Sequence, residues 1–196
     1  LAKNFQMVDK ESIGSYMDKY YFSYDISKEV GEKLVTAADI LHGEQAVQEI
    51  MEVFTERIMN NTWLSEGSKK NALEKLNNMA INVGRPDKWI SEALNNIEGC
   101  TNALEDLYSI RKTRLNAYKI LNGKPTKQYS LHAMLMDNSD TTLGEPNAFY
   151  QPNYNSINLL PFFITSPWYD ASQNSAINYE TYNTFGHEIT HGFDAT

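Results

Sequence analysis

Residues 186–194 read Gly-His-Glu-Ile-Thr-His-Gly-Phe-Asp and contain the pattern His187-Glu188-x-x-His191. Two histidines four residues apart lie one turn above each other on a helix, so both imidazoles can reach one ion. Zinc accepts imidazole nitrogens in a tetrahedral arrangement, and catalytic zinc sites leave one position for water. Glu188 stands beside the first histidine, where its carboxylate can take a proton from that water. The pattern therefore predicts a zinc site with its own general base.

The residues around this pattern predict an amphipathic helix over about residues 178–194. At about 100° per residue, the apolar side chains fall on one side of this helix: Tyr182, Phe185, Ile189 and Phe193. The two histidines fall on the opposite side, together with Glu180, Thr184 and Asp194. Such a helix can pack one face and present ligands to a cleft. The alternative is a pair of surface histidines beside a solvated glutamate.

The first two-thirds of the chain reads as helical. Apolar residues recur at three- and four-residue steps over residues 37–60, as one face of a helix requires. Ser65 can cap a second helix, which we expect to end at Val83-Gly84-Arg85-Pro86 and to bury Leu73, Leu76, Met79 and Ala80. A third helix is predicted over residues 102–121, before Gly123 and Pro125.

The pattern changes after Lys124. One strand-like piece covers residues 129–136, and two short extended segments follow at 147–150 and 156–160. Proline has no N–H to give to a sheet, so Pro146 indicates a strand at a sheet edge. We therefore predict a mainly α protein with a small β region (α+β), with a helical region over residues 1–123 and the edge strands and metal-binding helix over residues 124–196.

The composition excludes several classes of protein. The 196 residues are 41% hydrophobic and 21% charged, which excludes a disordered tail. The net charge is −8 and the lysines and arginines are scattered, so no nucleic-acid partner is expected. The single cysteine, Cys100, excludes an internal disulfide framework, and no apolar run is long enough to span a membrane.

The residues after the histidine pattern separate the classes of zinc peptidase. Metzincins need glycine at the eighth position of the motif, where this chain has Asp194. A glutamate from a later helix is then the expected third zinc ligand, and no residue follows Thr196. We therefore expect that ligand in a further, C-terminal part of the same protein. Glu180, Asp194 and His132 are the alternatives within the chain.

The sequence resembles the neprilysin-like zinc metallopeptidases, a family that includes neprilysin, endothelin-converting enzyme and bacterial oligopeptidases of the PepO type. Residues 186–194 match the zinc-site signature of that family. Other landmarks occur in the family's order: Trp63-Leu64-Ser65 with Lys69, Val83-Gly84-Arg85-Pro86-Asp87, Asn147-Ala148-Phe149-Tyr150, and Asn155-Ser156-Ile157. The chain departs from the family at Pro146, where valine is usual, and over residues 180–184, which are bulkier than usual.

The resemblance implies part of a helical domain followed by the first part of a thermolysin-like catalytic domain. It implies a zinc-dependent endopeptidase or oligopeptidase that acts on peptide substrates. His187 and His191 correspond to the zinc ligands and Glu188 to the general base. Asn147 and Ala148 correspond to the strand that pairs with the substrate backbone, where Asn147 offers its amide to a peptide group.

Three further residues have two interpretations each. Phe163 and Trp168 align with positions that line a pocket for a hydrophobic residue after the scissile bond, or they are core aromatics. Asp194 steadies a ligand imidazole or is a solvated residue at a helix end.

The rival function is a non-catalytic module that binds peptides through the Asn147 strand. Without the third ligand we expect the chain alone to be inactive, and its single cysteine favours a bacterial enzyme, cytoplasmic or at the cell surface.

Overall fold

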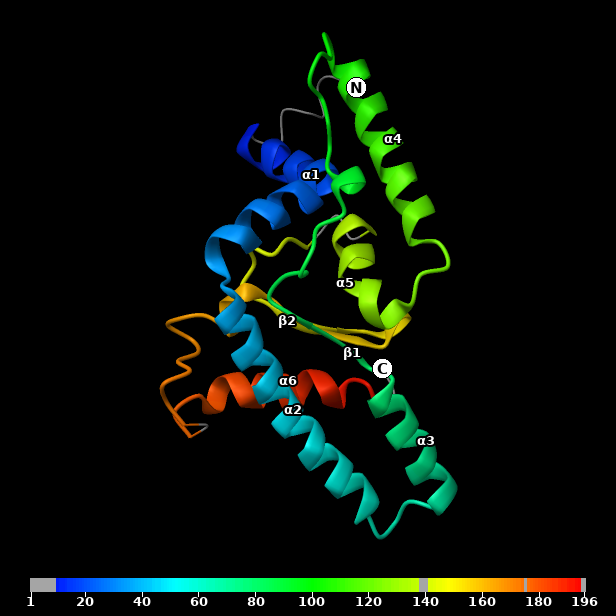
Figure 1. Ribbon diagram of the computed structural model, residues 1–196, viewed down its shortest axis with the longest axis vertical. Coiled ribbons are helices and arrows are strands. Elements are labelled where there is room, and N and C mark those ends of the chain that lie inside the picture. The colour runs from blue at the N-terminus through cyan, green and yellow to red at the C-terminus, as the bar shows by residue number, and fades with distance from the viewer. Residues whose placement is uncertain (1–9, 138–140, 175, 195–196) are drawn as a thin grey trace.

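The computed structural model describes residues 10–137, 141–174 and 176–194, which form six α-helices around a small sheet. The sheet has the strands β1 (Ala80–Val83), β2 (Ala148–Gln151) and β3 (Ser156–Leu159), in the order β1-β3-β2. β1 runs parallel to β3 and β2 runs antiparallel to it. This confirms the predicted fold class, mainly α with a small β region (Figure 1).

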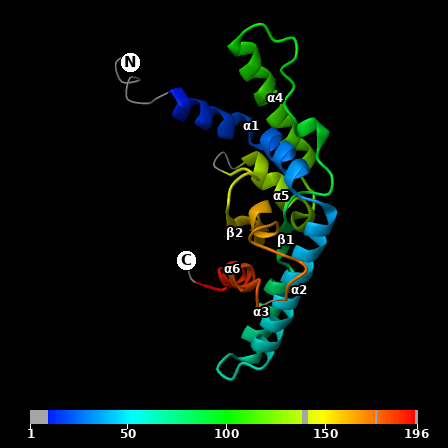
Figure 2. The same ribbon diagram turned by 90° about the vertical axis from the view of Figure 1, so that its left-hand side faces the viewer.

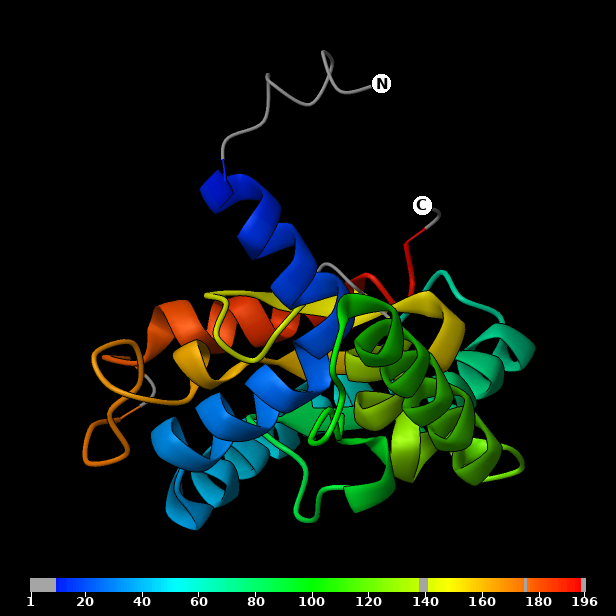
Figure 3. The same ribbon diagram turned by 90° about the horizontal axis from the view of Figure 1, so that it is seen from above.

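The helices lie on both sides of this sheet. They are α1 (Lys10–Leu34), α2 (Ala37–Met59), α3 (Glu66–Asn77), α4 (Ala103–Leu121), α5 (Thr126–Asp137) and α6 (Tyr179–Thr190). α4 and the α2–α3 pair extend from the sheet in opposite directions (Figures 1 and 2). Seen from above, the first turns of α1 extend away from the rest of the chain (Figure 3). None of the helices in the described part of the chain is both long enough and apolar enough to cross a membrane.

The first three helices predicted from the sequence are present, with their capping residues. Thr36 and Asp39 form a reciprocal capping box at the start of α2. The Ser65 hydroxyl accepts the Ser68 N–H at 3.1 Å, which confirms the predicted cap of α3. The Asn102 side chain accepts two N–H groups at the start of α4. These caps fix where each helix begins.

The sheet separates two hydrophobic cores. On one side, α2 and α6 bury a cluster that includes Val47, Met79, Ile157, Phe185 and Ile189. On the other side, α1 and α5 bury a second cluster that includes Tyr24, Met134, Leu135, Leu143 and Leu160. β1 comes from the predicted helical region and pairs with β3 from the predicted catalytic region. The two regions therefore share one sheet, and the predicted boundary at residue 123 stays a prediction.

Two sequence expectations about secondary structure were wrong. Residues 129–136 belong to helix α5 and not to a strand, because nearly every residue from Ser130 to Met136 is buried and the segment has no clear alternation to separate the two periods. The helix after Ser65 ends at Asn77, well before Val83. Met79 and Ala80 are fully buried as predicted, but Ala80 opens β1 because the sheet supplies its backbone partners.

Candidate metal centre

The loop before α6 fixes the start of the helix. The Asn178 side chain is buried and clasps Asp170, accepting its N–H at 3.0 Å and donating to its carbonyl at 2.9 Å. The Thr181 hydroxyl donates to the Trp168 carbonyl at 3.0 Å. Phe185 and Ile189 are fully buried against α2 and the sheet. Phe185 and Ile189 therefore face the core as predicted, and His187 lies on the exposed side. The predicted helix is too long, because α6 ends at Thr190, and Phe193 at the end of the predicted apolar stripe is 38% exposed.

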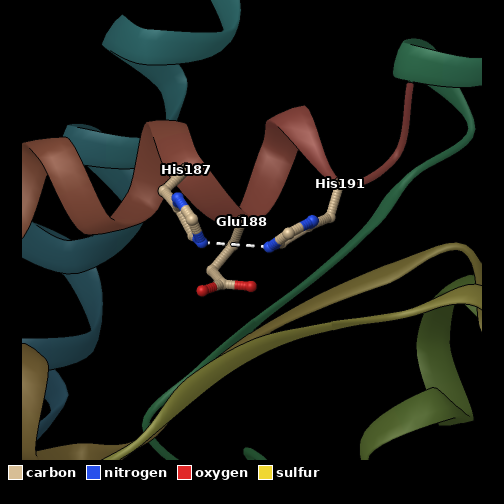
Figure 4. Close-up of side chains that lie close together, drawn as sticks. All are labelled: His187, Glu188 and His191. Carbon is tan, nitrogen blue, oxygen red and sulfur yellow. Dashed lines mark hydrogen bonds between the residues drawn. The ribbon is translucent and has the colours of Figure 1, made fainter. Parts of the chain in front are cut away.

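The imidazoles of His187 and His191 converge on one point. Their Nε2 atoms are 3.0 Å apart and their rings are nearly perpendicular, at 88° (Figure 4). Two ligands of a tetrahedral zinc ion lie about 3.3 Å apart when each bond is about 2.0–2.1 Å. A small rotation of either ring would reach that separation, so these residues fit a zinc ion. In the described part of the chain, one cluster of three His, Cys, Asp or Glu residues has its possible ligand atoms within 4.8 Å of one another. This cluster is His187, Glu188 and His191.

The other nitrogen of His191 contacts a carboxylate. Nδ1 of His191 lies 2.6 Å from Oδ2 of Asp194, so the ring N–H donates to that oxygen. This contact leaves the lone pair of Nε2 directed at the point where the two histidines meet. A carboxylate on the far nitrogen is the usual partner of a metal-ligating histidine, because it fixes the tautomer and the ring orientation.

Glu188 is turned away from solvent and onto the sheet. Its side chain is buried, and Oε2 accepts the backbone N–H of Tyr150 at 2.8 Å. Burial raises the pKa of the Glu188 carboxyl, and this effect exceeds the opposing effects of His187 and of the Tyr150 N–H. A carboxylate with a raised pKa is a better proton acceptor for a general base.

Strand β2 presents an open edge beside this helix. β2 pairs only with β3 in the described sheet, and the Tyr150 N–H points away from β3 to Glu188. Because backbone direction alternates along an antiparallel strand, the N–H and C=O of Ala148 point to the same outer side. Asn147 lies just before β2, with its carbonyl bonded to the Leu160 N–H at 3.3 Å and its side chain exposed.

The structure does not bring every predicted residue into the cluster. Phe163 and Trp168 contact each other and Phe162 in an aromatic group before α6, with ring centroids 5.2–6.3 Å apart. Phe163 packs partly on the core, whereas Trp168 is 39% exposed. Within the described ranges, no hydrogen bond or ring contact joins either residue to the histidines.

Two of the alternative third ligands also lie outside the cluster. His132 is buried in the second core, where Nδ1 lies 2.8 Å from the Tyr24 hydroxyl. Glu180 is exposed in the first turn of α6. Asp194 contacts Nδ1 of His191, the ring nitrogen that faces away from the Nε2 atom of His187. The described residues therefore bring together two imidazoles and the Glu188 carboxylate.

Comparison with known proteins decides the family. The N-terminal model of peptidase family M13 matches residues 7–86, and the peptidase model of the same family matches residues 147–196. The chain belongs to peptidase family M13. This result confirms the neprilysin-like resemblance that the zinc-site motif and the upstream landmarks predicted.

The M13 relatives are much longer than this chain. Neutral endopeptidase from Lactobacillus helveticus is 27% identical over 187 residues, which cover 94% of this chain and 26% of that protein. Neprilysin-1 from Caenorhabditis elegans is 31% identical over 158 residues, which cover 76% of this chain and 20% of that protein. The chain thus spans about a quarter of the length of the curated relatives it matches.

Solved structures show the same fold. The crystal structure of PepO from Lactobacillus rhamnosis HN001 has a TM-score of 0.61 at 24% identity, covering 89% of this chain and 27% of that one. The Mycobacterium tuberculosis zinc metalloprotease Zmp1, solved in complex with an inhibitor, also has a TM-score of 0.61, at 21% identity. It covers 95% of this chain and 27% of its own.

Two features of this M13 site were not predicted from the sequence. One is the Tyr150 N–H, which holds Glu188. The other is the reason for Gly192: a Cβ atom there would lie 2.8 Å from Cε of Met79 and 3.6 Å from the Tyr150 ring. Glycine allows the end of α6 to approach the sheet closely. Both residues belong to quoted motifs, but their roles depend on contacts between distant segments.

Proposed function

We propose that this M13 chain carries the zinc-binding helix and the substrate-binding strand of a zinc-dependent endopeptidase. The observation that carries the proposal is the convergence of the His187 and His191 Nε2 atoms beside a buried Glu188 carboxylate that is held on an edge strand. These three residues supply two metal ligands and a base within one helix turn. Family membership and the donor set both favour zinc.

The residues of the chain would divide the chemistry among them. His187 and His191 would hold the ion, and Asp194 would keep the His191 ring in the metal-binding tautomer. Bound zinc would polarise the peptide carbonyl and lower the pKa of a water molecule. Glu188 would accept the proton of the attacking water and pass it to the leaving amine. The Tyr150 N–H would orient Glu188 for both transfers.

The open edge of β2 would bind the substrate. An extended peptide can add to an exposed strand edge through backbone hydrogen bonds, and the Ala148 N–H and C=O point outward. The exposed Asn147 amide at the end of this edge would bond a peptide group of the substrate. The aromatic group of Phe163 and Trp168 would supply apolar surface for a substrate side chain.

The third zinc ligand would come from a part of the protein outside this chain, as a glutamate on another helix. Catalytic zinc normally has three protein ligands and a water, whereas the described residues offer two imidazoles and one carboxylate that is engaged by the sheet. The length of the relatives supports this proposal. We expect the 196-residue chain on its own to be inactive.

The rival proposal is a binding module that holds peptides on β2 without hydrolysing them. Zinc content and cleavage of an internally quenched peptide, measured on the full-length protein, separate the two. One zinc per chain together with zinc-dependent cleavage supports the peptidase. A protein that binds the peptide but leaves it intact with zinc present would support the binding module.

A further inference from the structure

Lys75, near the end of α3, places its ammonium group over two aromatic rings beside the metal centre. Its Nζ atom lies 5.7 Å from the ring centroid of Tyr150 and 5.9 Å from that of Phe193. Tyr150 gives its N–H to Glu188, and Phe193 follows His191 by two residues. The ammonium therefore lies at the end of the site where β2 and the end of α6 meet.

Hydrogen bonds fix the backbone of Lys75 relative to these rings. The Asn155 side chain donates to the Lys75 carbonyl at 3.1 Å. The same side chain accepts the Tyr150 hydroxyl at 2.9 Å. One asparagine thus joins the end of α3 to the strand that carries Tyr150. These bonds fix the backbone of Lys75 relative to Tyr150, so the start of its side chain has a defined position beside the Tyr150 ring.

The charge of Lys75 is available to a ligand. Three other lysines are paired with carboxylates: Lys28 with Glu32, Lys33 with Glu29 and Lys69 with Glu66. Lys75 is exposed, and no ion pair is formed by it within residues 10–137, 141–174 and 176–194. The faces of two aromatic rings attract a cation, but they do not neutralise it. A carboxylate could approach this ammonium from solvent.

A peptide on β2 would pass this group. It would pair with the outward N–H and C=O of Ala148, but the next outward N–H, that of Tyr150, is already bonded to Glu188. Regular pairing would therefore stop at Tyr150, and the peptide would leave the strand over the Tyr150 ring. We propose that Lys75 is a specificity residue that binds a carboxylate of the peptide where it leaves β2. This inference rests on the proposed function, because it assumes a peptide on β2.

The test is peptide binding to the full-length, zinc-loaded protein in which Glu188→Gln prevents hydrolysis. One set of labelled peptides carries Glu or Gln at each position in turn, and a second set ends in a carboxylate or an amide. Peptide binding is compared between the protein that keeps Lys75 and the variants Lys75→Met, Lys75→Glu and Lys75→Arg. Lys70→Met is the matched control, since Lys70 is also an exposed lysine of α3. Zinc content of each variant reports whether the site is intact.

We expect the carboxylate peptide of one pair to bind about fivefold more tightly than its neutral twin, as for an exposed ion pair. Lys75→Met should remove this ratio, Lys75→Glu should invert it, and Lys75→Arg and Lys70→Met should keep it. The ratio should shrink as salt rises from about 0.05 to about 0.5 M. An effect in the Glu and Gln set would indicate a side-chain carboxylate as the ligand of Lys75, and an effect in the second set would indicate the C-terminal carboxylate of the peptide.

An unchanged ratio in Lys75→Met and Lys75→Glu, in both sets, would overturn the inference, and so would a protein that binds none of the peptides. Hydrolysis is measured separately with Glu188 intact. A protein that shows the Lys75-dependent preference but cleaves nothing would contradict the proposed peptidase function and leave the role of Lys75 standing.

Discussion

The backbone N–H of Tyr150 donates a 2.8 Å hydrogen bond to Oε2 of Glu188. This contact joins the edge strand β2 to the helix that carries both histidines. The strand that would bind the substrate is therefore also the strand that positions the proposed base. The hydrogen bond therefore fixes the carboxylate of Glu188 relative to the open edge of β2.

Replacing Glu188 with glutamine should keep zinc bound and lower peptide hydrolysis by about 10²–10⁴-fold, because the amide keeps the shape of the side chain but accepts no proton. The measurement is kcat/KM for a quenched peptide together with zinc content in the full-length protein. Glu180→Gln is the matched control, since Glu180 is an exposed glutamate of the same helix. Near-normal turnover by Glu188→Gln would mean that another group takes the proton.

Replacing Asn147 with alanine should lower kcat/KM by up to about 10²-fold and leave zinc content unchanged, because one hydrogen bond to the substrate backbone is lost. The Asn147 side chain is exposed, so the substitution should not disturb the core. Asn153→Ala, in the exposed turn after β2, serves as the control. If kcat/KM for several peptides is the same in wild type and Asn147→Ala, Asn147 does not contact the substrate.

Stability should fall in acid partly because of His132. Burial lowers the pKa of this ring from 6.5 to about 4. The unfolded chain therefore binds a proton near pH 6.5, whereas the folded chain resists protonation until about pH 4. The resulting stability is complete above pH 6.5 and is lost as the pH falls from 6.5 to about 4. The loss should be on the order of 3 kcal/mol.

The check is the free energy of unfolding from urea titrations at several pH values between about 4 and 7.5, a window set by the two pKa values of the ring. His132→Gln should flatten the pH dependence in this window, because glutamine does not titrate. His42→Gln, on α2, controls for the loss of a histidine elsewhere. Equal slopes in wild type and His132→Gln would show that the ring titrates alike in both states.

Local sequence patterns predicted the parts of the structure that depend on neighbours along the chain. The His187–His191 spacing predicted that the two imidazoles meet, and the apolar stripe predicted that Phe185 and Ile189 are buried on the other side of α6, as the structure has them. Ser65 predicted the start of α3, because a serine hydroxyl can accept a backbone N–H in the first turn of a helix. In each case the signal and the structure lie within a few turns of one helix.

The features that sequence reasoning missed depend on contacts between distant segments. The segment 129–136 is buried on nearly all sides, so its apolar residues show neither the spacing of a helix nor that of a strand. Its helical form becomes clear only from its packing against the sheet and α1. Ala80 joins a sheet because Ser156 lies beside it, far along the chain. The Tyr150 contact to Glu188 uses a backbone N–H, which every residue but proline has, so no side-chain type could announce it.

The isolated 196-residue chain should bind zinc weakly and hydrolyse no peptide. In its described residues, the imidazoles of His187 and His191 offer two zinc ligands where their Nε2 atoms meet, whereas a catalytic zinc site normally has three protein ligands. The comparison is zinc titration and a fluorogenic peptide assay on this chain alone and on this chain with a segment that supplies the proposed third ligand, joined or added separately. Tight one-to-one zinc binding and turnover by the chain alone would contradict this expectation.

Anomalous diffraction at the zinc edge, from crystals of the full-length, zinc-loaded protein, tests most directly whether His187 and His191 hold a catalytic zinc ion. We expect one strong peak at about 2.0–2.1 Å from Nε2 of both histidines, with the Glu188 carboxylate nearby and outside bonding distance. A zinc peak elsewhere, or stoichiometric zinc with no peak between these two rings, would contradict it.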